Sequence, residues 1–204
     1  MVRLVAFGLC AALLGFAAPT AGWAADDDTD WPCPQQRTGA ISAAAVWSGP
    51  DIAKTGRWDD DEEAAVLARK LASRRTPLDE MDGLIDAFAA KAGADKDDRL
   101  THVFAGVLEI VNSERDRVMA GVARYARGQK RLADKIRAEA DKIGDEQENK
   151  DLSPAQTLDL AKTDLKWDRR IFDERAHALS YVCETPTLLE RRVFEIARKI
   201  QERL

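Results

Sequence analysis

The chain has 204 residues, with 31 Lys or Arg and 36 Asp or Glu side chains, and a formal net charge of −5 at pH 7. This length suits one ordinary domain with a hydrophobic core of its own. The chain contains no glycine-rich phosphate loop, serine nucleophile elbow, zinc-ligand spacing or Ser-His-Asp constellation. Their absence excludes the enzyme classes that these motifs mark, and it favours a protein that is not an enzyme and needs no cofactor.

Residues 1–24 have the pattern of a secretory signal peptide. Arg3 supplies a positive charge, residues 4–18 are apolar, and Gly22 and Ala24 provide the small side chains of a cleavage site. A membrane-spanning helix needs about 20 apolar residues, so the apolar run is too short to be one. No later segment is apolar enough to span a membrane.

The signal peptide predicts where the protein resides. We expect a mature chain that begins at Ala25 and is periplasmic, a setting that argues against a nucleic acid partner. Lipidation at Cys10 is the alternative, but the preceding residues Phe7-Gly8-Leu9 depart from the Leu-small-small pattern that usually comes before a lipidated cysteine.

Cys33 and Cys183 are the cysteines that remain after the signal peptide is removed, and they predict one structural disulfide. Closing a loop of about 150 residues stabilises the fold by roughly 4 to 5 kcal/mol in the chain-entropy model. A redox or nucleophilic thiol is the alternative, but the Cys-x-x-Cys spacing and the basic neighbours that lower a thiol pKa are missing. Proline on both sides of Cys33 instead stiffens an extended segment.

Residues 25–58 predict an extended strap that lies over helices. They contain Trp31, Trp47 and Trp58 together with Pro32 and other helix breakers, and they show little helical periodicity. A site for a sugar or another flat ligand is the alternative role for these tryptophans, although large aromatic side chains usually serve packing.

Residues 59–93 predict a pair of short helices. The acidic run 59–63 suits a helix N-terminus, and apolar residues at helical spacing continue to about Ser73. The sequence Thr76-Pro77-Leu78-Asp79 then supplies an N-cap, a first-turn proline and an acidic third position, and Gly93 ends this second helix.

Residues 98–204 predict a long helical hairpin with a further C-terminal helix. From Phe104 to Ile143, the chain follows alternating steps of four and three, which is a heptad repeat. We expect one helix from Asp98 to Asp145, which would be about 70 Å long at 1.5 Å per residue. A helix of this length needs a partner along its whole extent.

The partner is predicted to be the next helix. Residues 145–152 are mostly polar, and Ser153-Pro154-Ala155-Gln156 is a capping box with proline at the first helical position. A second heptad pattern runs from Leu158 to Val182. The sequence Thr185-Pro186 then ends this helix and begins a separate last one.

A short loop between two heptad helices implies an antiparallel hairpin. The register pairs Ile143 with Leu158, Ile136 with Leu165, Gln129 with Phe172, and Val122 with Leu179. The predicted fold class is therefore all-α, a long antiparallel coiled-coil hairpin with additional short helices and an extended N-terminal strap.

Polar residues interrupt the seam between these two helices. They are Arg115, Gln129 and Glu139 on the first helix, and Asp168 and Arg175 on the second. Buried charges cost several kcal/mol unless they are paired, so these positions either fix the register or mark an open part of the seam. An open seam would accept a third helix. The alternative is that the helices at 59–93 and 186–204 fill it.

Residues 115–142 form the most basic part of the chain. A basic stripe of this kind can meet an anionic membrane or another polyanion. The alternative is that the stripe is solvated or faces residues 26–98, which carry 17 acidic and 9 basic side chains.

Glu174 and His177 form a Glu-x-x-His pair, the spacing that places two metal ligands on one helix face in di-iron bundles. The other histidine, His102, lacks a matching glutamate three residues earlier, and in the register given above it lies roughly 33 Å away along the hairpin. A helical-bundle metal-binding protein is therefore the alternative function.

These features favour an exported helical protein that acts by protein interaction. It would be an accessory subunit, a scaffold or a chaperone-like binder, and its partner would be another envelope protein or a second copy of itself.

Overall fold

The protein is described from a computed structural model that covers residues 31–149 and 154–204. The elements in chain order are α1 (Ala43–Val46), η2 (Ile52–Lys54), α2 (Glu62–Ala72), α3 (Met81–Ala92), η3 (Gly93–Asp95), α4 (Lys96–Glu148) and α5 (Ala155–Gln201). Every regular element in the described ranges is helical, which confirms the all-α class. The predicted signal peptide, the first residues of the strap and the Ser153 cap lie outside the described residues.

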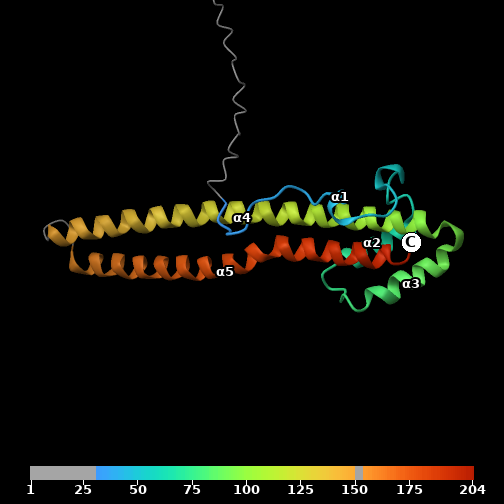
Figure 1. Cartoon of the computed structure of the whole chain (residues 1–204). Coiled ribbons are helices and arrows are strands. Elements are labelled where there is room, and N and C mark those ends of the chain that lie inside the picture. Colours follow the sequence, from blue (N-terminus) through green and yellow to red (C-terminus); the bar gives the residue numbers. More distant parts are fainter. Residues whose placement is uncertain (1–30, 150–153) are drawn as a thin grey trace, which may run out of the picture.

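α4 and α5 lie side by side over most of their lengths and run in opposite directions (Figure 1). The Gln129 Nε2 group donates to the backbone oxygen of Phe172 at 3.0 Å. Six residues further along α4, Lys135 Nζ lies 2.7 Å from a carboxylate oxygen of Asp168, which precedes Phe172 in α5. Residue numbers therefore rise along one helix as they fall along the other. The predicted pairing of Gln129 with Phe172 is present in this register.

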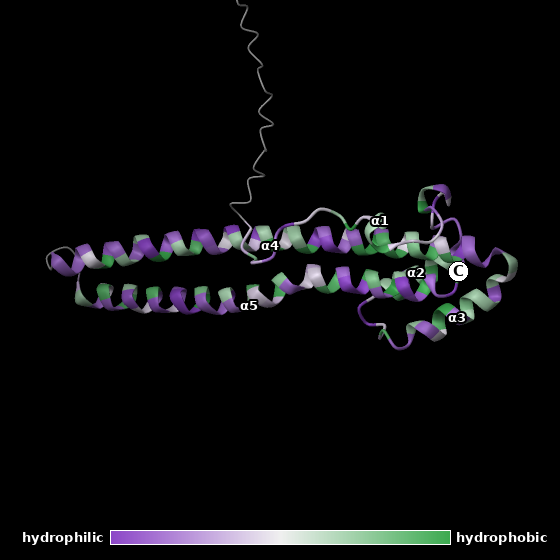
Figure 2. Cartoon of the chain, viewed as in Figure 1, coloured by the Kyte–Doolittle hydropathy of each residue, from purple (hydrophilic) through white to green (hydrophobic). Residues whose placement is uncertain are grey.

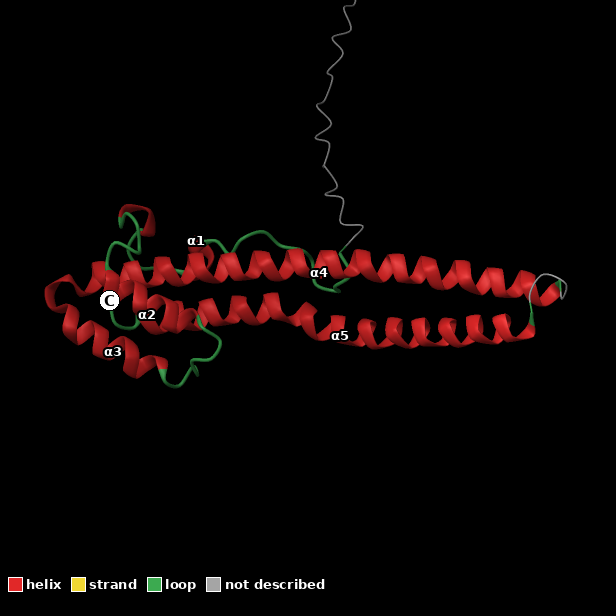
Figure 3. Cartoon of the chain, turned by 180° about the vertical axis from the view of Figure 1, so that it is seen from behind, coloured by secondary structure: helices red, strands yellow, loops and turns green. Residues whose placement is uncertain are grey.

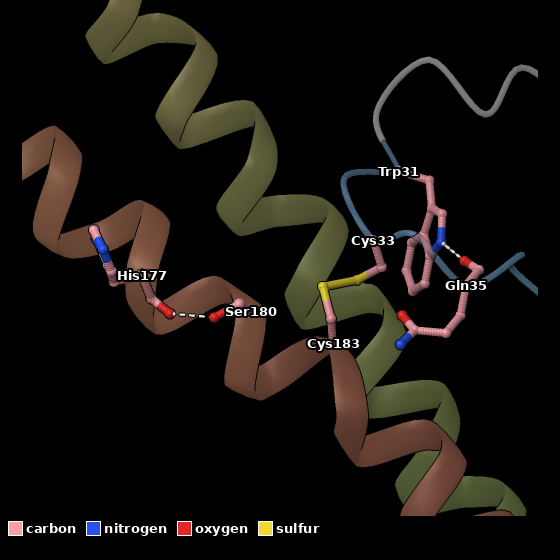
Figure 4. The surroundings of a disulfide bond; sticks show 6 residues. All are labelled: Trp31, Cys33, Gln35, His177, Ser180 and Cys183. Carbon is pink, nitrogen blue, oxygen red and sulfur yellow. Dashed lines mark hydrogen bonds between the residues drawn. A yellow bond between two sulfur atoms is a disulfide. The ribbon is translucent and has the colours of Figure 1, made fainter.

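The prediction of a separate helix after Thr185 is wrong, because α5 continues through Pro186. Proline lacks the N–H that would donate to the carbonyl four residues earlier, and it usually kinks or ends a helix. Here Cys183 is fixed by a disulfide on one side of the proline and Leu189 is buried in the core on the other. Both flanks are held in place, so the helix bends and does not end (Figures 1 and 4).

The hydrophobic core lies at one end of the hairpin. There α2 and α3 pack against the N-terminal part of α4 and the C-terminal part of α5. The large side chains that are fully buried in this core include Leu71, Met81, Ile85, Leu100, Phe104, Val107, Leu189, Ile196 and Ile200. This end is a four-helix bundle, and the predicted helices at 59–93 are two of its members.

The strap follows α4 in the opposite direction. The Ile41 backbone N–H donates to Asn112 Oδ1 at 2.8 Å, and Asn112 Nδ2 donates to the Ile41 carbonyl at 3.1 Å. Further along the strap, Trp47 stacks on Phe104, with ring centroids 4.1 Å apart and planes 7° from parallel. The strap is not extended throughout, because α1 and η2 form two short turns within it.

Two glycines of α4 have opposite surroundings. A Cβ added at Gly106 would lie 2.5 Å from the Trp58 ring and 2.8 Å from the Ala68 Cβ, so the close approach of the strap and α2 requires glycine there. At Gly128 the nearest atom to an added Cβ is a terminal guanidinium nitrogen of Arg131, at 3.9 Å. Only the first glycine is needed for packing within the chain.

Within the single chain, we expect Gly128→Ala to raise the free energy of unfolding by about 0.5 to 1 kcal/mol, because alanine loses less backbone entropy in a helix. Gly106→Ala should lower it by about 1 to 3 kcal/mol, because the new methyl overlaps two packed neighbours. Urea denaturation followed by circular dichroism measures both changes. Equal effects at the two positions would contradict the packing described for Gly106.

Asp61 joins α2 to α4. Its Oδ1 accepts from the Ala64 backbone N–H at 3.0 Å as the N-cap of α2, and its Oδ2 accepts from Arg99 Nε at 2.7 Å. The hydrogen bond from Arg99 holds the pKa of the Asp61 carboxyl at about 2, below its ordinary value of 3.8. A depressed carboxyl pKa contributes stability that is present above the ordinary pKa and lost as pH falls toward the folded value.

Asp61→Asn should therefore lower the free energy of unfolding by about 1 to 2 kcal/mol at pH 6, with a deficit that disappears between pH 4 and pH 2. Asparagine is also a good N-cap residue, so the change isolates the ion pair. Denaturant midpoints measured across this pH range test it. Asp79→Asn, at an exposed carboxylate, is the control, and a deficit that persists at pH 2 would show that the cap was lost instead.

Candidate functional site

Beyond the bundle, α4 and α5 continue as a two-helix arm, defined as residues 122–148 and 155–182. The large core cluster reaches Val111 on α4 and begins at Leu189 on α5. Views from the front and from behind show only α4 and α5 along the arm, within the part of the chain that the structure describes (Figures 1 and 3). The helices of residues 59–93 therefore fill the bundle end of the seam and leave the arm as a pair.

Arg115, the first predicted seam residue, lies in the bundle and binds the strap. The residue is 2% exposed. The guanidinium donates to the Thr38 carbonyl at 3.2 Å and also to the Gly39 carbonyl and the Thr38 hydroxyl. A Glu190 carboxylate oxygen lies 3.6 Å away. Arg115 is therefore a structural anchor for the strap and is not available to a partner.

The other four seam positions lie in the arm. Gln129 is buried and uses its amide N–H on Phe172, while its Oε1 has no hydrogen-bond partner. Lys135 lies between Asp168, at 2.7 Å, and Glu139, at 3.4 Å. The Asp168 hydrogen bond is the larger cause of the raised pKa of Lys135. Three of the predicted seam residues are thus used within the hairpin.

Arg175, the last of these positions, contributes through its backbone. Its carbonyl accepts from the Tyr125 hydroxyl at 3.1 Å, and its side chain is exposed. The seam between α4 and α5 is therefore closed by their own polar contacts.

One flank of α5 carries large apolar side chains that are exposed to solvent. Leu160, Trp167 and Tyr181 are 62%, 56% and 76% exposed. They fall on one seven-residue series, and Ile171, at 37% exposed, lies on the same side. We call Leu160, Trp167, Ile171 and Tyr181 the α5 stripe. Hydrophobic turns recur along this part of α5 in Figure 2.

The sequence reasoning missed the α5 stripe, although its spacing is visible in the sequence. The residues that face α4 and the residues of the stripe both recur every seven positions, so α5 carries two apolar series. A helix with one partner needs only one apolar series, so the second series indicates a further surface.

A pocket of about 250 Å³ lies between α4 and α5 at the base of the arm. It is lined by Val118, Gly121, Val122, Tyr125, Ala178, Leu179 and Val182. We call it the arm pocket. A Cβ added at Gly121 would meet only a guanidinium nitrogen of Arg124, at 3.9 Å. Gly121 and Gly128 therefore leave space on α4, with only the guanidinium ends of Arg124 and Arg131 near it.

The predicted disulfide joins Cys33 to Cys183, with Cα atoms 5.5 Å apart (Figure 4). Both cysteines are buried with Val122, and Trp31 packs against them. The Trp31 indole N–H donates to the Gln35 carbonyl at 2.7 Å. The disulfide therefore fixes the start of the strap at the boundary between bundle and arm.

Glu174 and His177, the predicted metal pair, are engaged separately. Arg170 Nε lies 2.9 Å from Glu174 Oε1, and His177 Nδ1 lies 2.8 Å from the Asp173 carbonyl. His102 is distant on α4, with its Nε2 2.6 Å from the Thr55 carbonyl. Within residues 31–149 and 154–204, no group of three or more His, Cys, Asp or Glu side chains is arranged to hold a metal ion.

The tryptophans of the strap do not gather at one site. Trp47 stacks on Phe104, Trp58 lies against Gly106, and Trp31 covers the disulfide. Each fills a different position on the long helices, which is a packing role.

The predicted basic stripe pairs in part with carboxylates of its own helix. Arg137 lies 2.7 Å from Asp134, and Lys142 lies 3.8 Å from Glu146. No helix in the described ranges is both long enough and apolar enough to cross a bilayer.

No family model, curated protein or solved structure matches this chain. The arm, its α5 stripe and the arm pocket therefore have to be interpreted from their own geometry.

We expect replacement of both disulfide cysteines, Cys33→Ser with Cys183→Ser, to lower the free energy of unfolding by about 2 to 4 kcal/mol. The strap near Arg115 should also become accessible to protease, because the disulfide no longer attaches the start of the strap to α5. Guanidinium denaturation and limited proteolysis, each with and without reductant, measure the two effects. Reductant should change the wild type and leave the double variant unaffected, and cleavage inside α2 in place of the strap would contradict the prediction.

Proposed function

We propose that this protein is exported to the periplasm and acts there by protein interaction, using the two-helix arm as its binding surface. In this role it is an accessory subunit, a scaffold or a chaperone-like binder of the cell envelope. The observation that carries the proposal is the exposure of Leu160, Trp167 and Tyr181 on one flank of α5. Large apolar side chains grouped on one surface mark interaction sites in soluble proteins.

The chemistry of the surface suits a helical partner. Anchors repeat every seven residues, as in grooves that receive an amphipathic helix. Exposed aromatic side chains such as Trp167 and Tyr181 are the residue types that most often dominate binding energy. Another envelope protein or a second copy of the chain could supply the helix.

The remainder of the molecule suits a support for this surface. The bundle buries the core, and the disulfide and Arg115 fasten the strap at the base of the arm. A disulfide at this position fits an oxidising compartment, in agreement with the signal peptide pattern of residues 1–24.

Export and binding can be tested together in cells that produce the full chain. Mass spectrometry of the purified protein should show that it begins at Ala25. A photo-crosslinking amino acid placed at Trp167 or Tyr181 should then give one defined adduct, because these side chains would face the partner.

The matched control positions are Lys166 and Ser180, which are the immediate neighbours on the polar side of α5 and are also exposed. They should give no adduct. Adducts of equal yield from both faces, or none from the stripe, would count against the arm as the binding surface. Retention of residues 1–24 would count against export.

A further inference from the structure

We infer that the arm binds a second copy of itself, so that two arms form one four-helix bundle about a twofold axis. This inference rests on the proposed function and names the partner of the same surface. It is carried by three properties of the described residues: the exposed α5 stripe, the arm pocket, and the charges beside them.

The stripe allows two copies to pair in antiparallel fashion. Leu160, Trp167 and Tyr181 fall on one exposed seven-residue series of α5, with Glu174 between the two aromatic side chains. An isologous twofold contact uses the same surface on both copies, so each stripe would lie against the arm of the other copy.

Antiparallel coiled coils often pair a large side chain of one helix with a small one of the other, and this indicates a register. Trp167 of one copy would lie level with Ala178 of the other, and the twofold axis would pass near Phe172. Ala178 lines the arm pocket. The Trp167 ring of each copy would then cover the arm pocket of the other, which gives that apolar hollow an aromatic side chain to fill it.

Charges agree with this register. Since Gln129 bonds to Phe172 within one copy, α4 and α5 are aligned, and Glu174 of the second copy falls level with Lys130 and Arg131. Arg131 extends its guanidinium to within 3.9 Å of the position that a Gly128 Cβ would occupy. By symmetry, Glu174 of each copy lies near Lys130 and Arg131 of the other. These opposite charges favour the dimer and this register.

The glycines of α4 fit the same arrangement. Gly121 and Gly128 each have room for a side chain within the single chain, so packing in one copy does not require them. Each lowers helix stability by up to about 1 kcal/mol relative to alanine. A second α5 lying beside α4 would use the space that they leave, because helix backbones approach closely only over small residues.

Light scattering of the purified mature chain with its disulfide intact tests the inference. The wild type should have twice the chain mass at micromolar concentration. Trp167→Asp and Tyr181→Asp should each raise the dissociation constant at least about 30-fold. Ser180→Asp introduces the same charge one residue away and should leave the dimer unchanged, and circular dichroism should show equal helicity in all variants.

Cysteine pairs test the register. A chain with Trp167→Cys and Ala178→Cys should oxidise to a covalent dimer, because these positions face each other between copies and lie roughly 16 Å apart within one. A chain with Lys166→Cys and Ser180→Cys, on the polar side, should not.

A wild type that stays monomeric would overturn the inference, as would a dimer that persists in both Asp variants. Photo-crosslinks from Trp167 to a different protein, obtained with a monomeric wild type, would leave the proposed function standing without this partner. Crosslinks only to a second copy would support the inference and exclude an envelope client at the stripe.

Discussion

The antiparallel contact between α4 and α5 is the constraint on which the rest of the structure depends. Its register is fixed where Gln129 meets Phe172 and Lys135 meets Asp168. At about 1.5 Å per residue the 53 residues of α4 span roughly 80 Å, far more than the small core can cover. One half of the hairpin therefore becomes part of a bundle, and the other half extends as an arm whose surface is free for other contacts.

The long helices also organise the segments that have no regular structure. Backbone carbonyls outside helices need donors when they are shielded from water. Arg115 supplies them to the strap. Arg192 donates to the carbonyl of Leu71 at the end of α2 and to those of Ser73 and Thr76 in the connection between α2 and α3. These arginines act as rigid forks that hold loop backbone against a helix. The bundle is thus held together by polar attachments as well as by its apolar core.

Much of this fold follows from sequence patterns, since heptad spacing fixes both helix length and pairing. The register between Gln129 and Phe172 could be predicted because a short loop leaves little freedom of alignment. The continuity of α5 could not, because local rules end a helix before Pro186, whereas the disulfide at Cys183 and the burial of Leu189 are contacts distant in sequence.

The candidate site shows the same division. Arg115 and Gln129 are unusual in a heptad, so the sequence singles them out, but it does not reveal that the first binds the strap and the second binds a backbone carbonyl. The exposure of Trp167 depends on how many helices surround α5, and this number is set by where α2 and α3 pack. Apolar spacing alone therefore does not separate a core face from a surface face.

The bend of α5 at Pro186 has a mechanical consequence. The arm is attached to the bundle where one helix lacks a backbone hydrogen bond and where the strap is covalently joined at Cys183. From there to Ala155 the helix extends about 42 Å. A change of 10° in the bend would move the tip of the arm by about 7 Å. The angle of α5 at Pro186 therefore sets the position of the tip, and the disulfide at Cys183 lies next to this bend.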